Sequence, residues 1–459
     1  MNCKEKQSGR VSRRDFLRLS GLTIGGLVLA RCAPASPAPT TAEPTSVPEE
    51  QPTVVSEPAA AETVELTFWG WQGFVDKDQG ILDKFTEKNP NIEVKFDNFE
   101  WNAFISILKT SMQAGNVADV VQPFGAWVIP YAKGGMLLEV PQELLTYSQA
   151  RDIYFPTTLG GYVYEGKLYG FPHDLNQEYG SALGNLAMFE EAGVAWPPAW
   201  ATWDDMITDA ETLTKTADDG SITVAGLNFI NPDNVGFLLL GGILEQGGDY
   251  FASDGRHFNF DTPETRNTIQ LLVDVAQKYN IIDPVVYSGA GMGAPVGIWN
   301  EKNAISLTGV WVAGWGADYP NMRVGAALHP PLFGSDHVFA ADAGWGLFVP
   351  KQTGKINEAW QLARYLGTDP EAVEMWIADS SIPALVEMMP KAVEMNPNLQ
   401  VITDLLPKGR FIGDVTDRDK LFFEIWHPRI MEAMIGTKTV DEAAVTIHKE
   451  ANAVVDAAA

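Results

Sequence analysis

From residue 64 onward, short β-rich stretches alternate with amphipathic helical stretches, and this alternation limits the possible fold more than any other feature of the chain. Asn89 and Pro90 end the first helical stretch, and Gly115 ends the second. This β-α-β-α-β order predicts an α/β fold in which a parallel or mixed sheet carries helices on its faces. The expected strands are residues 64–69, 92–96 and 119–121, with helices around residues 81–85 and over residues 101–113.

Helix-start signals continue the same rhythm in the second half of the chain. Thr262 precedes Pro263, and Asp369 precedes Pro370, which places a capping side chain before a proline of the first helical turn. Residues 439–442 have the spacing of a capping box ahead of a final helix. Because no period of 20–50 residues recurs, a solenoid is excluded.

The first 32 residues have the composition of an export signal. Ser-Arg-Arg-Asp-Phe-Leu at residues 12–17 precedes an apolar run at residues 19–30, which is shorter than the roughly 20 residues of a membrane span. The paired arginines resemble a bacterial twin-arginine signal, and Leu-Ala-Arg-Cys at residues 29–32 resembles a lipoprotein cleavage site. We therefore expect Cys32 to be acylated; the alternative is a plain secretory signal with an incidental cysteine.

Residues 33–63 consist largely of Pro, Ala, Thr, Ser and Glu, with few side chains to bury. Such a segment cannot offset the entropy of ordering, so we expect a disordered tether. A lipid anchor, a tether and a globular body form a sensible layout for an exported protein. We expect this one on the outer face of the cytoplasmic membrane or in the periplasm, touching the membrane only through its anchor.

The charge and the cysteine content exclude several classes of function. Acidic residues outnumber basic ones 59 to 32, for a formal net charge of −27, which disfavours binding to nucleic acids. The two cysteines, Cys3 and Cys32, both lie in the N-terminal segment, so the rest of the chain has neither a disulfide framework nor a cysteine zinc site. The six histidines lack metal-ligand spacing. We expect no metal and no cofactor.

The chain carries no motif that indicates catalysis. It lacks the nucleophile elbow of hydrolases, the His-Glu-x-x-His of metalloproteases and the phosphate-binding P-loop. Residues 289–294 match a dinucleotide fingerprint in spacing, but the nearby Pro284 and Pro295 argue for a loop without an entering strand or an exiting helix. A glycosidase-like pair of carboxylates stays open, because Asp and Glu are abundant.

Tryptophan is the residue that stands out, with fourteen copies, several of them where expected strands end. In α/β sheets ligands bind beyond the carboxyl ends of the strands. An indole face packs well against the C–H face of a pyranose ring, and neighbouring acidic and amide groups can bond its hydroxyls. Helical stripes instead predict core positions for Trp360, Trp376 and Trp426. The candidates from this reasoning are Trp69, Trp71, Trp101 and Trp127, with Gln72, Glu100, Asp174 and Asn176 as hydrogen-bonding partners.

A series of motifs in a fixed order resembles the extracytoplasmic solute-binding proteins of ABC importers, in the carbohydrate-binding branch that includes maltose-binding protein. The similarity covers nearly everything from residue 64 to the C-terminus. Each motif is loose alone, but their order and spacing together are specific. The motifs are Leu-Thr-Phe-Trp at 66–69, Gln-Ala-Gly at 113–115, Ala-Asp-Val-Val at 118–121, Leu-Tyr-Gly-Phe-Pro-His-Asp at 168–174, the run ending in Gly-Val-Trp at 304–311, and Gly-Trp-Gly-Leu-Phe-Val-Pro-Lys at 344–351.

The resemblance implies a two-lobed periplasmic-binding-protein fold of type II, with hinge segments and a ligand cleft between the lobes. By analogy, residues 64–173 plus 344–385 form lobe 1, and residues 174–343 plus 386–459 form lobe 2. It supports the candidates named above and adds Gly125, Trp311, Trp315, Asp342 and Trp345 as ligand-facing residues. For Asp174 the alternative is a hinge residue that bonds backbone amides, and for Glu100 a solvated loop charge.

The function that the resemblance implies is that of a receptor, not of an enzyme. We expect a monomer that binds a sugar or oligosaccharide and delivers it to the membrane permease of an ABC importer. Two alternatives remain open. The same fold could bind a polyamine, an amine osmolyte or an iron chelate, because aromatic boxes also attract cations. A secreted glycoside-active enzyme is the third reading.

Overall fold

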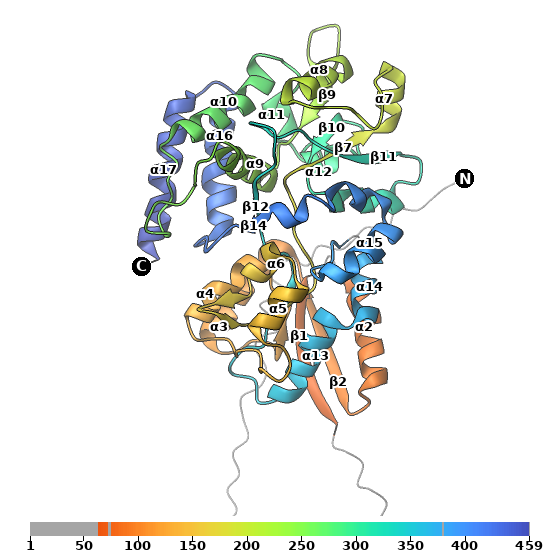
Figure 1. The fold of residues 1–459 in the computed structure, drawn as a ribbon, viewed down its shortest axis with the longest axis vertical. Coiled ribbons are helices and arrows are strands. Elements are labelled where there is room, and N and C mark those ends of the chain that lie inside the picture. The colour runs from red at the N-terminus through yellow and green to blue at the C-terminus, as the bar shows by residue number, and fades with distance from the viewer. Residues whose placement is uncertain (1–62, 72–74, 379–380, 459) are drawn as a thin grey trace, which may run out of the picture. The chain divides into compact units, whose positions relative to one another are not determined.

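A computed structural model describes residues 63–71, 75–378 and 381–458, which form two α/β lobes connected by three chain segments (Figure 1). The predicted signal, the acylated Cys32 and nearly all of the tether lie outside these residues, as do Cys3 and Gln72. The predicted α/β class and the two-lobed architecture are confirmed.

The sheet of the first lobe is built around strand β1 (Val64–Trp71). β1 pairs in parallel with β2 (Ile92–Phe99) and β3 (Val120–Val121), which gives the order β2-β1-β3. Leu66 and Phe68 alternate toward the core because successive strand residues face opposite sides. Beyond β3, an antiparallel bridge from Val121 to Phe348 leads to the pair β13 (Gly346–Leu347) and β6 (Phe171–Pro172).

Helices cover this sheet at the spacing that the sequence predicts. Ile81, Leu82 and Phe85 of α2 (Val75–Lys88) are buried, and α3 (Trp101–Ala114) ends where Gly115 takes a left-handed φ of 68°. The other elements of this lobe are η2 (Gly125–Trp127), α4 (Val128–Lys133), α5 (Tyr147–Ile153), α6 (Pro156–Gly160), the hairpin β4 (Val163–Tyr164) and β5 (Lys167–Leu168), α13 (Ile356–Thr368) and α14 (Pro370–Ala378).

The second lobe holds a mixed five-stranded sheet. Its order is β11 (Val324–Leu328), β7 (Ser181–Asn185), β10 (Asn303–Leu307), β9 (Ile222–Asn228) and β8 (Lys215–Thr216). β9 and β10 run parallel, whereas β7 is antiparallel to both of its neighbours. The helices that follow in chain order are α7 (Leu186–Ala192), α8 (Trp203–Leu213), α9 (Pro232–Glu245), α10 (Pro263–Gln277), α11 (Pro284–Tyr287), α12 (Ala294–Gly297) and η3 (Val310–Asp318).

The C-terminal part packs against the second lobe through α10, which contacts both α16 (His427–Met434) and α17 (Val440–Ala457). Thr439 and Glu442 form the predicted capping box at the start of α17, and the predicted cap Thr262 opens α10. The remaining elements are η4 (Val386–Met388), α15 (Met389–Met395), η5 (Pro397–Ile402), η6 (Leu406–Lys408), the π-helical η7 (Lys420–Trp426), and β14 (Gly409–Phe411), which pairs with β12 (Phe339–Ala341).

Three segments cross between the lobes and are hydrogen-bonded to one another. They lie between β6 and β7, between β12 and β13, and between α14 and α15. The His173 and Asp174 amides donate to the Trp345 carbonyl at 3.0 and 3.1 Å, and the Leu175 amide donates to the Ile382 carbonyl at 2.8 Å. The crossings therefore form one small hinge region. The exact limits of the lobes stay a prediction.

Two local predictions need correction. Strand β1 does not end before Gly70 but continues through Trp71, because its pairing with β2 extends to Trp71 opposite Phe99. Trp69 and Trp71 therefore belong to the strand and do not follow it. Residues 289–293 form a turn without an entering strand, as predicted, but a one-turn helix, α12, does follow it at Ala294. Pro295 is compatible with that helix because it lies in the first turn.

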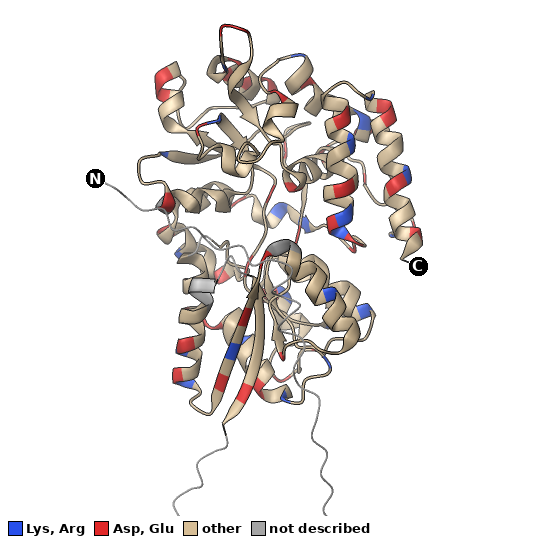
Figure 2. Cartoon of the chain, turned by 180° about the vertical axis from the view of Figure 1, so that it is seen from behind, with Lys and Arg blue, Asp and Glu red and all other residues tan. Residues whose placement is uncertain are grey.

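The charged residues are spread over both lobes. Figure 2 shows Asp and Glu interspersed with Lys and Arg on most described elements, and no basic face on the side that it draws. Among the described residues, no helix is both long and apolar enough to span a membrane.

Candidate functional site

The first aromatic group consists of Trp71, Phe124, Trp127 and Trp345, which come from the ends of strands in the first lobe and from the return crossing. The Trp71 and Trp345 rings lie parallel, with centroids 5.1 Å apart and an interplanar angle of 4°. Phe124 and Trp127 meet Trp345 edge to face at 5.5 and 6.1 Å. Three of the predicted tryptophans are thus brought together, although Trp71 is 274 positions away from Trp345 in the sequence.

Two glycines allow the return crossing to approach this group. The Gly125 amide donates to the Gly344 carbonyl at 2.6 Å, and a Cβ on Gly125 would lie 2.3 Å from that of Ala343. Gly344 has a left-handed φ of 67°. Gly125 therefore has a packing role, because a side chain at this position would clash with Ala343.

Three of the predicted residues lie at the edge formed by β1 and β2. The Trp69 ring packs edge to face on Phe99 with centroids 5.1 Å apart. The Glu100 side chain is exposed and accepts a hydrogen bond from the Ala103 amide at 3.2 Å, which makes Glu100 the N-cap of α3. The side chain of Trp101, the first residue of α3, lies outside the described part of the chain.

The second aromatic pair consists of Trp311 and Trp315 in η3, whose ring centroids are 5.3 Å apart. The indole N–H of Trp311 donates to Oε1 of Glu178 at 3.0 Å. Oε2 of Glu178 accepts from the Gly309 amide at 3.1 Å and from the Asn234 side chain at 3.0 Å. Burial raises the pKa of Glu178 to about 8. Trp311 is therefore positioned by a buried carboxyl that the sequence reasoning missed.

A buried arginine joins three more carboxylates. The guanidinium of Arg418 donates to Asp342 at 2.6 and 3.1 Å and forms ion pairs with Asp233 at 2.5 Å and Asp419 at 3.6 Å. We call these four residues the Arg418 cluster. Asp342 is fully buried, and burial raises its pKa to about 6 although Arg418 acts in the opposite direction. Asp342, which was predicted to face the ligand, thus pairs with Arg418.

The Arg418 cluster lies between the two sets of aromatic residues. Asp419 accepts a hydrogen bond from the indole N–H of Trp127 at 3.1 Å, and Arg418 lies 5.6 Å from the Phe124 ring centroid. On its other side, the cluster interacts electrostatically with Glu178, which holds Trp311. The Arg418 cluster and Glu178 therefore connect the tryptophans of the two lobes.

Asp174 and Asn176 lie in the first crossing segment. Burial raises the pKa of Asp174 to about 7, and its backbone is paired with Trp345 and, through an isolated bridge, with Pro383. The preceding His173 stacks on Trp376 at 4.3 Å, and its Nε2 lies 3.1 Å from Nε2 of Gln122. Asn176 is partly buried. The predicted hinge position of both residues agrees with the geometry.

The residues that the sequence reasoning missed are Glu178, Asp233, Arg418 and Asp419. Arg418 lies between Asp417 and Asp419 in the sequence, a pattern that could have indicated an ion pair. Its partner Asp342, however, lies 76 positions away. The predicted core positions of Trp360, Trp376 and Trp426 are confirmed, since all three are nearly inaccessible. Among the described residues, no group of three or more His, Cys, Asp or Glu is arranged to hold a metal ion.

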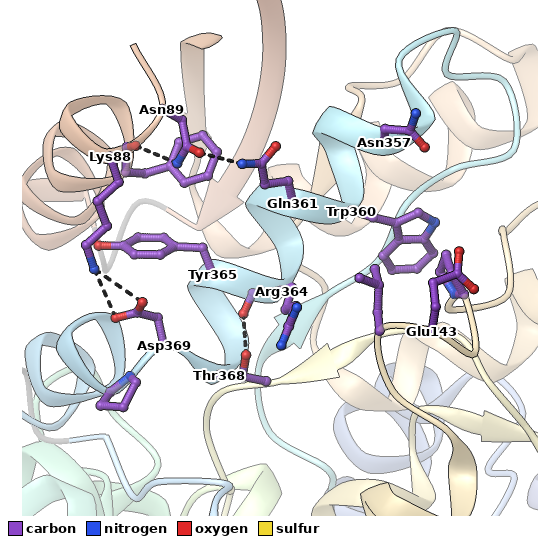
Figure 3. A pocket seen from close by; sticks show the side chains of 14 residues that line it. Lys88, Asn89, Glu143, Asn357, Trp360, Gln361, Arg364, Tyr365, Thr368 and Asp369 are labelled. Atoms are coloured by element: carbon purple, nitrogen blue, oxygen red, sulfur yellow. Dashed lines mark hydrogen bonds and ion pairs between the residues drawn. The ribbon is translucent and has the colours of Figure 1, made fainter. Parts of the chain in front are cut away.

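A separate hollow of about 650 Å³ lies between α2, α13 and residues 141–144 (Figure 3). Lys88 pairs with Asp369 at 3.2 Å and lies 4.9 Å from the Tyr365 ring centroid, and Gln361 bonds Asn89. These contacts join α2 to α13 and the start of α14, which accounts for the polar lining. The hollow shares no lining residue with the aromatic groups or the Arg418 cluster.

The two lobes, the three hydrogen-bonded crossings and the aromatic groups define a two-lobed binding protein. The chain belongs to the bacterial extracellular solute-binding proteins, since the model of that family matches residues 80–401. The predicted family is therefore confirmed at this level. Membership implies that the chain is exported and works outside the cytoplasm.

Individual relatives agree with this assignment. An uncharacterized ABC transporter extracellular-binding protein of Pyrococcus horikoshii is 26% identical over 370 residues, which are 77% of this chain and 79% of the relative. A Thermotoga lettingae solute-binding protein bound with tagatose has a TM-score of 0.69 at 21% identity, over 86% of this chain and all of that one. For a Listeria monocytogenes protein in complex with cycloalternan the TM-score is 0.72 at 19% identity, with the same coverage.

Proposed function

We propose that this chain is the receptor of an ABC-type importer that binds a sugar or oligosaccharide between its lobes and delivers it to the membrane permease. The observation that carries the proposal is the pairing of aromatic rings in both lobes, Trp71 with Trp345 and Trp311 with Trp315, which the Arg418 cluster and Glu178 connect. Indole faces suit the C–H faces of pyranose rings, and carboxylates suit hydroxyl donors. The sugar-bound structural relatives support the same reading.

The lobes would act by a shift of population. A sugar that contacts tryptophans of both lobes favours the closed arrangement by its difference in affinity for the closed and open states. The three crossings provide the hinge, and the link from Trp345 to His173 and Asp174 connects the binding surface to it. No covalent step is needed, and the receptor reading therefore proposes no enzymatic activity.

A panel of carbohydrates tests the proposal by thermal shift and calorimetry. The panel contains tagatose, maltotriose, mannotriose and cycloalternan. A sugar present at 100 times its Kd stabilises the folded state by about 2.7 kcal/mol, which raises Tm measurably. If no carbohydrate raises Tm while another class of solute does, the substrate proposal is wrong. Release of new reducing ends from an oligosaccharide would instead support the enzyme reading.

The charge of the Arg418 cluster favours a second class of ligand. Asp233, Asp342 and Asp419 surround a single cation, Arg418. An organic amine would find both aromatic faces and an excess of carboxylates there. Spermidine in the same thermal-shift panel separates the two ligand classes, because a shift with spermidine and with no sugar selects the amine.

We also propose that Cys32 anchors the receptor to the membrane and that residues 33–63 hold the monomeric body away from it. The pattern at residues 12–32 supports this proposal. Expressing the gene in a bacterium with and without a Cys32→Ser change tests it. The natural chain should fractionate with membranes and carry an acylated N-terminus, whereas the variant should be released. Release of both would favour a plain secretory signal.

A further inference from the structure

Residues 409–419, which we call the strap, contact both lobes in addition to the three covalent crossings. The strap begins with β14, which pairs with β12; β14 packs on α6 of the first lobe and β12 on α9 of the second (Figure 1). A Cβ on Gly160 of α6 would lie 2.4 Å from the Cβ of Phe411, so helix and strand approach closely. The strap is therefore a non-covalent link between the lobes.

The attachments of the strap to the second lobe are distributed along its length. The Arg410 guanidinium donates to the Asp249 carboxylate at 2.9 and 3.3 Å. The Tyr250 hydroxyl donates to the Ile412 carbonyl at 2.9 Å. Further along, the Arg418 cluster joins the strap to the first turn of α9. Because these contacts are spread over the whole segment, we expect the strap to stay with the second lobe when the lobes move.

An exposed ion pair attaches the strap to the first lobe. Lys133, the last residue of α4, pairs with Asp414, and their side chains are 43% and 35% exposed. Trp127 of the first lobe also donates to Asp419, but Asp419 belongs to the buried Arg418 cluster. The Lys133–Asp414 pair can therefore break and re-form without leaving a buried charge uncompensated.

The two partners of this ion pair come from different lobes, and this origin gives the pair its effect. A contact that exists in one arrangement of the lobes shifts the equilibrium toward that arrangement, whereas a pair within one lobe has no such effect. Exposed ion pairs change an equilibrium by roughly 1.5- to 5-fold. Arg256 of the second lobe repels Lys133 and so acts against the attraction by Asp414. The charge at residue 414 therefore decides the sign of this contact.

We infer that Asp414 is an affinity-determining residue outside the aromatic groups, because its ion pair with Lys133 favours the arrangement in which the strap joins both lobes. The effect on affinity rests on the proposed carbohydrate-binding function, whereas the effect on the arrangement of the lobes does not. When the pair is formed, less of the binding energy of the ligand is used to bring the lobes together. The apparent affinity rises accordingly.

Charge reversal in matched pairs tests the inference. Asp414→Lys places like charges across the lobes and should weaken sugar binding by about 3-fold or more. It should also increase the radius of gyration of the full chain in small-angle X-ray scattering. Glu139→Lys is the matched control, because Glu139 pairs with Lys167 at 3.0 Å within the first lobe and the change in net charge is the same. The control should alter neither value. Lys133→Glu combined with Asp414→Lys restores opposite charges and should recover both.

Calorimetry should use the carbohydrate of the panel that gives the largest rise in Tm, and thermal unfolding should show that every variant is folded. Four outcomes would overturn the inference and leave the proposed function intact: an unchanged radius of gyration in Asp414→Lys, a larger radius at unchanged affinity, an equal change in Glu139→Lys, or no recovery in the double variant. If no carbohydrate binds any of the proteins, the proposed function fails. The scattering comparison then still decides whether Asp414 holds the lobes together.

Discussion

Two pairs of tryptophans, one in each lobe, are held by different forces. Trp71 and Trp345 stack face to face, with ring centroids 5.1 Å apart. Trp311 packs on Trp315 but also donates a hydrogen bond to the buried Glu178. Removal of Trp311 leaves a buried acceptor with one partner fewer, which costs more than the lost contact. The second pair is therefore anchored by a buried hydrogen bond as well as by ring packing.

The largest expected effect comes from replacing Arg418, the cation of the Arg418 cluster. Arg418→Ala should destabilise the protein by about 3–5 kcal/mol, because Asp342 and its neighbours would stay buried without a counter-charge. Chemical denaturation measures the loss. The control is Arg323→Ala, whose exposed ion pair with Glu190 should be worth less than about 1 kcal/mol. Equal effects of the two changes would show that the cluster is not a structural centre.

Replacement of Trp345 should have the next largest effect. Trp345→Ala should reduce stability by about 3 kcal/mol, because the ring is buried against Trp71, Phe124 and Trp127. Trp345→Phe should recover more than half of that loss, since a smaller ring can still pack edge to face. Denaturation midpoints of the two variants test this order. A loss below about 1 kcal/mol for Trp345→Ala would mean that the first group contributes little to folding.

The second pair can be tested through pH. Burial raises the pKa of Glu178 to about 8, above its ordinary value of 4.5. A carboxyl with a raised folded-state pKa stabilises the fold fully below the ordinary pKa, and this contribution is lost as pH rises toward the folded-state value. The natural chain should therefore lose on the order of 3 kcal/mol relative to Glu178→Gln between pH 5 and pH 8. A difference that stays constant over this range would show that Glu178 does not titrate there.

Much of the fold was predictable because its signals are local. The alternation of strands and helices, the cap at Thr262 and the capping box at Thr439 each depend on residues within one turn, and all three are confirmed. The end of β1 was placed too early because Gly70 reads as a terminator, while the pairing with β2 that carries the strand to Trp71 is not local. Tertiary pairing overrides such a local preference.

The candidate site was predictable only in its aromatic part. Tryptophans at strand ends can be found from a sheet argument, and two of them, Trp71 and Trp127, both pack on Trp345, which only the family resemblance added. The sheet argument could not predict the Arg418 cluster, because the partners of Arg418, Asp233 and Asp342, come from segments far apart in the sequence. Ordinary helix capping also resembles ligand binding in a sequence, since both place a carboxylate after a strand.

Glu100 gives the smallest expected effect and separates those two roles. As the N-cap of α3 it accepts a hydrogen bond from the Ala103 amide. Glu100→Ala should cost about 0.5–1 kcal/mol of stability, whereas Glu100→Asp should match or exceed the natural chain, because Asp is a preferred N-cap residue. Sugar affinity should stay within about twofold in both variants if capping is the whole role of this carboxylate. A loss of affinity in Glu100→Ala that Glu100→Asp does not restore, at unchanged stability, would return Glu100 to the ligand-facing residues and extend the site to the edge formed by β1 and β2.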